Sequence, residues 1–161
     1  MIQAGGHEVA CHGLVHDTDK AFDVLSPEEQ LQHLLESKKI LEDISGEKVI
    51  SFRAPALRVN EHTPKALLEA GFCIDSSTAP QRFDFFLSFG GWKKLKWLLS
   101  PRLPYYTSKE SLLKKGDSEI FEVPLNSFFI SYIGTTMRMF PAMAAVMRRL
   151  VHLEYKMHDK P

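Results

Sequence analysis

His12 and His16 stand four residues apart near the N-terminus, and His7 lies just upstream. If the backbone turns helically here, residues at positions i and i+4 share one face, with Cβ atoms about 5–6 Å apart. A neutral imidazole nitrogen binds Zn²⁺ at about 2.0–2.1 Å, and a catalytic zinc site usually has three protein ligands and one open position. The spacing therefore predicts that His12 and His16 supply two ligands of a divalent metal site, with zinc as the expected metal, whose third ligand lies elsewhere.

The alternative interpretation of this pair is two loop histidines that bind no metal. Two carboxylates lie near the pair in the predicted fold and could replace the missing ligand, Asp17 and Asp75. The two cysteines, Cys11 and Cys73, sit in apolar surroundings, and two cysteines do not make a disulfide scaffold. We expect both to be reduced, buried thiols.

The composition is that of a globular protein. The chain has 161 residues, long enough for one domain with a real core, with 44% hydrophobic and 25% charged residues. Lys and Arg number 20, as do Asp and Glu, so the formal net charge is zero. A nucleic-acid-binding surface needs a basic surplus, which this balance argues against.

No apolar stretch approaches the 18 residues or so of a transmembrane helix. The N-terminus lacks the basic region and apolar run of a signal peptide. The sequence leaves open whether the protein is cytoplasmic or exported from a bacterium.

Helices and strands are predicted to alternate in the first half of the chain. Ser26, Pro27 and Glu29 form a helix start with a capping box, and Gly46 ends that helix. The apolar stripe of this helix consists of Leu31, Leu34, Leu35, Leu41 and Ile44. Strands are predicted at residues 8–11, 48–52 and 72–74, with a second helix from Thr63 to Gly71. The order strand, helix, strand, helix, strand predicts an α/β fold with parallel strands, in a sheet or barrel.

The second half is less regular. Residues 80–118 are aromatic, and we interpret them as loop and cover packing, with a sugar-stacking surface as the alternative. A strand is predicted at residues 119–123, ended by Pro124, and a helix at residues 141–152. The expected buried face of that helix consists of Met143, Val146, Met147, Leu150 and Val151.

Several segments resemble the motifs of polysaccharide deacetylases, the NodB-homology or carbohydrate esterase 4 family. Gly6-His7-Glu8-Val9 with His12-Gly13-Leu14-Val15-His16 is similar to the family's second motif, in which His-(Ser/Thr)-x-x-His supplies two metal ligands. Phe52-Arg53-Ala54-Pro55 resembles its third motif, Arg-x-Pro, and Glu122-Val123-Pro124 resembles a later Glu-x-Pro strand. Gly13 stands where the family has Ser or Thr, which removes a hydroxyl that orders the loop.

This resemblance implies a metal-dependent N-deacetylase on a partial, distorted (β/α) barrel of the glycoside hydrolase/deacetylase type. Its substrate would be a polysaccharide or another N-acetylated glycan. The implied ligands are His12 and His16; Arg53 would serve catalysis by orienting an aspartate base, and Pro55 would line the substrate groove. A metal-bound water, with its pKa lowered towards about 7, would attack the acetamide carbonyl.

Two motifs of the family do not match any segment. The first, a strand ending in two aspartates, carries the third metal ligand and the base, and the last, Leu-x-His, carries the acid. We therefore expect residues 1–161 to form a single deacetylase domain that is incomplete at both ends. His152 and His158 are acids only by default, and the more direct interpretation places both at a surface or helix end.

Two hypotheses follow. In the first, the chain is a deacetylase domain, inactive if it is truncated in this way, whose open strand edges would favour self-association. In the second, it is a non-catalytic remnant that binds a glycan or a partner protein through the aromatic stretch.

Overall fold

The computed structural model describes residues 3–17, 20–80, 97–128, 130–131, 137–138 and 141–158. Contacts divide the chain into two compact units. Unit 1 consists of Met1–Thr78 and Leu103–Val123, and unit 2 of Ala79–Arg102 and Pro124–Pro161. In the described part of the chain, no helix has the length and apolar character needed to cross a bilayer.

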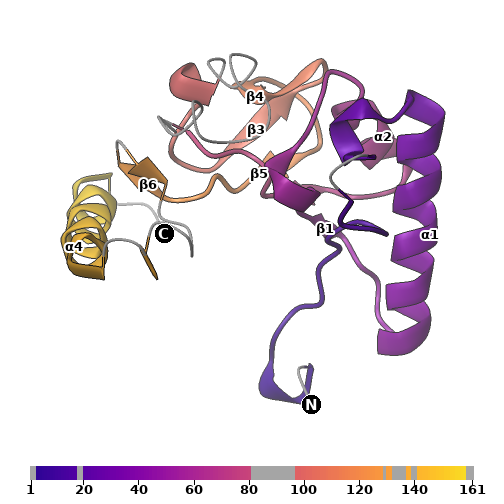
Figure 1. The fold of residues 1–161 in the computed structure, drawn as a ribbon, viewed down its shortest axis with the longest axis horizontal. Coiled ribbons are helices and arrows are strands. Elements are labelled where there is room, and N and C mark those ends of the chain that lie inside the picture. Colours follow the sequence, from indigo (N-terminus) through magenta and orange to yellow (C-terminus); the bar gives the residue numbers. More distant parts are fainter. Residues whose placement is uncertain are drawn as a thin grey trace. The chain divides into compact units, whose positions relative to one another are not determined.

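Unit 1 is built on a mixed sheet. Its strands are β1 (Ser51–Phe52), β2 (Ile74–Asp75), β3 (Tyr105–Ser108), β4 (Ser111–Lys115) and β5 (Phe121–Glu122), in the order β1-β2-β5-β3-β4 (Figure 1). The first three in that order run parallel, β3 is antiparallel to β5, and β4 is antiparallel to β3. The predicted parallel pairing is confirmed for residues 48–52 and 72–74, and the strand predicted at residues 119–123 is present as β5. The predicted strand at residues 8–11 is reduced to one parallel bridge from Cys11 to Phe52.

The first helix begins and ends where the sequence predicts. Helix α1 (Pro27–Ser45) has Ser26 as its N-cap, with both hydrogen bonds of the capping box to Glu29. Gly46 ends it in the left-handed conformation, with φ of 72°. These local interactions satisfy backbone groups that a helix leaves without partners at its ends.

Helix α2 (Thr63–Glu69) lies beside α1, and Figure 1 shows the two together. Lys38 of α1 donates from Nζ to the carbonyl oxygens of Ala70 and Gly71, both at 2.9 Å. Its ammonium also lies 4.9 Å from the centre of the Phe72 ring. A cation at this place stabilises the carbonyl end of α2.

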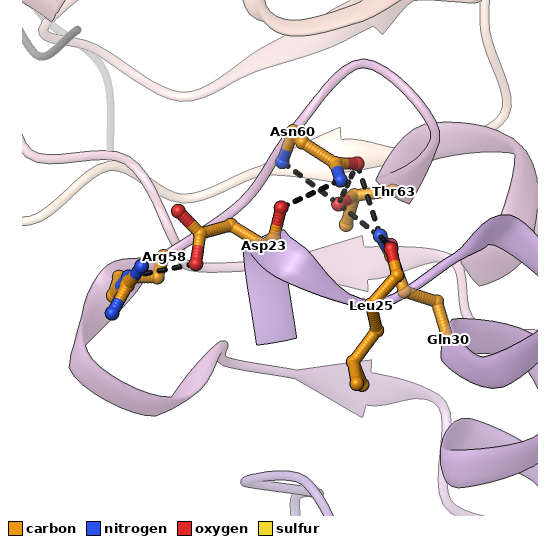
Figure 2. A network of polar contacts seen from close by, with 6 residues as sticks. All are labelled: Asp23, Leu25, Gln30, Arg58, Asn60 and Thr63. Atoms are coloured by element: carbon orange, nitrogen blue, oxygen red, sulfur yellow. Dashed lines mark hydrogen bonds and ion pairs between the residues drawn. The ribbon is translucent and has the colours of Figure 1, made fainter. Parts of the chain in front are cut away.

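A polar network ties the segment before α1 to the start of α2 (Figure 2). Asn60 Nδ2 donates to the Asp23 carbonyl, while Gln30 Nε2 donates to the side chain of Asn60 and to the Leu25 carbonyl. Thr63 Oγ1 donates to Gln30 Oε1. Gln30 is fully buried, and this network satisfies its amide group, as a buried polar side chain requires.

The core lies between the helices and the sheet. Phe52 is its centre, with ring centres 5.4 Å from Phe22 and 5.7 Å from Phe72. Leu34 and Leu67 bring α1 and α2 onto it, and both are fully buried. The predicted stripe of α1 is wrong in two positions, since Leu35 is 48% and Ile44 80% exposed.

The β3–β4 hairpin corrects the interpretation of residues 80–118 as loop and cover. Tyr105 and Thr107 of β3 are buried while Tyr106 is exposed, which is the alternation of a strand with one face on the core. Cys73 is exposed, so of the two thiols expected to be buried only that of Cys11 is.

Unit 2 contains β6 (Ser127–Phe128), β7 (Ile130–Ser131) and α4 (Pro141–His158), so the last helix extends beyond the predicted residue 152. Met147 lies on its buried face, but Val146 is 55% exposed, contrary to prediction. Glu154 of α4 pairs with Arg102 at 2.6 Å. Most of the aromatic residues proposed for sugar stacking, from Phe83 to Trp92, lie outside the described residues, and Trp97 is buried.

Candidate functional site

Two predicted site residues follow neighbouring parallel strand segments. The Cys11 amide donates to the Ser51 carbonyl, and the Arg53 amide donates to the Cys11 carbonyl, both at 2.9 Å. His12 and Arg53 therefore leave the sheet at the same edge, where the carboxyl ends of parallel strands meet. This edge is where (β/α) barrels carry their active sites.

One ring nitrogen of His12 is committed to the backbone. Nδ1 lies 2.8 Å from the Arg53 carbonyl oxygen. Because a carbonyl only accepts, Nδ1 must carry the hydrogen, which leaves Nε2 with a free lone pair in the neutral ring. A backbone carbonyl on the second ring nitrogen is the usual arrangement of a metal-binding histidine.

His16 lies beside His12, although no helix connects them. The two ring centres are 5.7 Å apart, with the planes tilted by 51°. Gly13 has φ of 81°, which interrupts any helical turn between the histidines and corrects the helical premise of the spacing argument. A loop nevertheless brings the rings together, and two imidazoles on one tetrahedral metal ion would have centres roughly 5 Å apart.

Pro55 lies under this loop. Its side chain is buried, and a Cβ atom added to Gly13 would meet Pro55 Cγ at 2.9 Å and Cδ at 3.2 Å. The Arg-x-Pro segment and the His-x-x-x-His segment are thus in direct contact. That Pro55 lines a substrate groove stays a prediction.

Arg53 is held by the end of the next strand. Its Nε donates to the Ser76 carbonyl at 3.0 Å, and Nη2 donates to Ser76 Oγ at 2.6 Å. Ser76 Oγ donates in turn to the Val123 carbonyl at 2.7 Å. A chain of hydrogen bonds therefore runs along the sheet edge from His12 through Arg53 and Ser76 to the end of β5.

The donor set fits part of a metal site. His12 and His16 are exposed, close together and composed of ligand types that zinc prefers. Within the described ranges, no group of three His, Cys, Asp or Glu side chains is arranged to hold a metal ion, and neither Asp17 nor Asp75 completes the pair. The roles predicted for His12, His16 and Arg53 stay predictions.

A buried acid pair lies next to this edge. Asp75 and Glu122 are register partners on the adjacent parallel strands β2 and β5, and both are fully buried. Burial raises the pKa of both groups, and the neighbouring Asp75 charge raises the pKa of Glu122 further. The pair could not be predicted from the sequence, because only the register between β2 and β5 brings the two residues together.

Other residues considered from the sequence do not join this edge in the described structure. His152 is an exposed residue of α4, in unit 2. The side chain of His158 lies outside the described part.

Comparison with known proteins places the family match on the first half of the chain. The polysaccharide deacetylase family model matches residues 1–74. The peptidoglycan deacetylase of Helicobacter pylori is 27% identical over 128 residues, which make up 78% of this chain and 41% of that protein. A peptidoglycan deacetylase-like protein of Gibberella zeae is 32% identical over 76 residues, or 47% of this chain and 22% of the relative. The chain thus spans less than half the length of these relatives.

Two crystal structures are similar in fold. A polysaccharide deacetylase from Mycobacterium smegmatis superposes with a TM-score of 0.55 at 23% identity, covering 92% of this chain and 48% of its own. The PuuE allantoinase gives a TM-score of 0.51 at 17% identity, covering 91% and 44%. Both are (β/α) barrels, so the predicted fold class, an α/β fold that forms part of such a barrel, is confirmed.

Proposed function

We propose that this chain, whose residues 1–74 match the polysaccharide deacetylase family model, takes part in metal-dependent hydrolysis of N-acetyl groups on a glycan. His12 and His16 are the proposed ligands of the metal, which we expect to be zinc. The observation that carries the proposal is the His12 ring, whose Nδ1 is held by the Arg53 carbonyl and whose centre lies 5.7 Å from that of the His16 ring.

The chain's own residues would supply orientation and binding. His12 is fixed in one tautomer, so its Nε2 is ready to bind without rearrangement of the ring. Arg53 is fixed by Ser76, and its remaining N–H groups would orient a carboxylate that acts as base. A bound metal ion would supply a water activated at neutral pH and polarise the amide carbonyl.

The proposed substrate is a polysaccharide with N-acetylated sugars. The two curated relatives are named for peptidoglycan, whose glycan strands carry such sugars. The other protein with a similar fold is named as an allantoinase, so the fold alone does not select the substrate. The exposed His12, His16 and Arg53 are compatible with a large substrate that binds from solvent.

The experiment measures metal content and activity together. The 161-residue chain is purified, loaded with Zn²⁺, freed of excess metal, and analysed by mass spectrometry of the metal. Acetate release is then measured with peptidoglycan and with N-acetylglucosamine oligomers. We expect zinc in the wild type and near-zero zinc in the His12→Ala/His16→Ala variant.

The matched control is His62→Ala/His152→Ala, which removes two exposed histidines outside the site. It should bind zinc like the wild type. Equal, near-zero zinc in the wild type and the His12/His16 variant would refute the metal site in this chain. Zinc binding without acetate release would support the second hypothesis, a domain that binds a glycan or a partner protein but does not hydrolyse it.

A further inference from the structure

The environment of Asp75 and Glu122 is unusual for two carboxyl groups. Both are fully buried on adjacent parallel strands, β2 and β5. In the part of the chain that the structure describes, no Lys, Arg or His forms a hydrogen bond or ion pair with either group. Two neighbouring buried anions without a counter-charge are strongly unfavourable, so the pair strongly favours the state with one proton and one negative charge.

The hydrogen bonds show which group carries the negative charge. Asp75 accepts from Ser77 at both oxygens, from the hydroxyl at 2.6 Å and from the amide at 3.3 Å. Glu122 Oε1 accepts from the amide and the hydroxyl of Thr78, at 3.1 and 2.7 Å. Glu122 Oε2 is buried, and none of the described residues donates a conventional hydrogen bond to it. A proton on this oxygen would turn it into a donor, and the Asp75 carboxylate at the paired position of the neighbouring strand would be its acceptor.

The third side chain at the same register is neutral. Tyr105 on β3 is the register partner of Glu122, and its hydroxyl donates to the Leu112 carbonyl at 2.5 Å. Burial and the neighbouring acid pair raise the pKa of Tyr105 above its usual range, so the phenol stays protonated. A neutral phenol supplies no counter-charge, so Tyr105 does not help both carboxyl groups to ionise.

The pair is connected to the candidate site through Ser77. Ser77 Oγ donates to Asp75 and accepts from the Ala54 amide at 2.9 Å. Ala54 is fully buried between Arg53 and Pro55, so this bond fixes the middle of the Arg-x-Pro segment.

We propose that Asp75 and Glu122 share one proton, carried on Glu122 Oε2, and that the pair acts through Ser77 to position the Arg53–Pro55 segment. Below the pH at which Glu122 ionises, its O–H donates to Asp75, and the hydrogen bond from the Ala54 amide to Ser77 Oγ is intact. Above it, the proton passes to solvent, the two carboxylates repel each other, and the bond from Ala54 to Ser77 opens. The consequence for hydrolysis rests on the proposed function. The Glu122 proton and the hydrogen bond from Ala54 to Ser77 can be measured without activity, so this proposal and the proposed function can fail separately.

The first measurement is a carbon-13 NMR titration of the side-chain carboxyl groups in the wild-type chain. We expect the Glu122 carboxyl carbon to keep the shift of a protonated acid at a pH where exposed carboxyl groups are ionised. Assignment comes from the loss of this signal in Glu122→Gln. Ionisation of both Asp75 and Glu122 together with the exposed carboxyl groups would overturn the proposal.

The second measurement is the hydrogen-exchange protection factor of the Ala54 amide as a function of pH. In the wild type it should fall about fivefold as Glu122 ionises, the size expected for one hydrogen bond. Glu122→Gln keeps an acceptor for Thr78 and gives a donor to Asp75, so it should retain protection and lose the pH step. The same step in Glu122→Gln as in the wild type would overturn the proposal.

Two further variants separate the effect of the Glu122 proton from that of the hydrogen bond between Ala54 and Ser77. Ser77→Ala should lower Ala54 protection at every pH and leave the Glu122 carboxyl signal in its protonated position. Glu119→Gln replaces an exposed glutamate of the same segment and should leave the pH step unchanged. Unchanged Ala54 protection in Ser77→Ala would show that the pair does not act through Ser77.

Discussion

Gly13 offers a sharp test of how the histidine loop is built. Its φ of 81° lies in the left-handed region, and the neighbouring Pro55 ring leaves no room for a side chain. Gly13→Ala therefore introduces two separate costs. A non-glycine residue in this conformation loses about 1–2 kcal/mol, and a methyl group 2.9 Å from the buried Pro55 Cγ adds an overpacking cost of about 1–3 kcal/mol.

Gly46 is the matched control. Its φ of 72° is nearly the same, but a Cβ atom there would meet nothing within 4 Å. Gly46→Ala should therefore show the conformational cost alone, about 1–2 kcal/mol. The difference between the two variants isolates the contact with Pro55.

The assay is urea unfolding of both variants and the wild type, followed by circular dichroism. We expect Gly13→Ala to reduce the free energy of unfolding by about 1 kcal/mol or more beyond Gly46→Ala. Equal losses, within about 0.5 kcal/mol, would refute the close approach of Pro55 to the loop.

Three other substitutions test the frame that holds the site. Ser26→Ala removes the N-cap of α1 and should cost about 1 kcal/mol, measured by urea unfolding against Glu36→Ala at an exposed position of the same helix. Leu34→Ala should cost about 2–5 kcal/mol, whereas Leu35→Ala, at an exposed position of the same helix, should change the midpoint little. Glu122→Gln should remove a pH dependence of stability. The folded-state pKa of Glu122 is raised above 4.5, so the folded state holds a proton that the unfolded state releases. The free energy of unfolding of the wild type therefore falls as the pH rises from about 4.5 towards the raised value. At about pH 4, 6 and 8, the urea midpoint of the variant should rise relative to that of the wild type as the pH rises. The same difference between the two midpoints at every pH would contradict this.

Local signals in the sequence predicted local structure well. The capping box of Ser26 and Glu29 and the left-handed Gly46 are fixed by neighbours within a few residues, so both ends of α1 followed from the sequence. The parallel pairing of residues 48–52 and 72–74 also followed, because strand and helix patterns alternate regularly up to residue 75.

The sequence predicted less well which face of α1 is buried. Leucines at Leu31, Leu34 and Leu35 fit one broad helical stripe, yet the sheet and α2 cover only the side that carries Leu34. Which side of a broad stripe meets the core depends on the partner elements, which the helix sequence does not contain. The β3–β4 hairpin was missed for a related reason, since its strands are rich in Ser and Lys and only Tyr105, Thr107 and Leu112 are buried.

For the candidate site, the sequence predicted the residues but not the backbone conformation that brings them together. His12, His16, Arg53 and Pro55 were predicted from two short motifs, and the structure brings them to one sheet edge. The spacing argument assumed a helix between the histidines, whereas the left-handed Gly13 produces a loop. A spacing of four residues is thus compatible with paired rings in more than one backbone conformation.

The residues that hold these motifs lie outside the segment with the family match. That match ends at residue 74, and Ser76, which binds Arg53, and Ser77, which binds Ala54, come directly after it. Ser76 is held in turn by the Val123 carbonyl at the end of β5. The histidine and Arg-x-Pro motifs therefore depend for their geometry on parallel pairing with β2 and β5. Substitutions at these supporting positions should change the site without touching any residue of the motifs themselves.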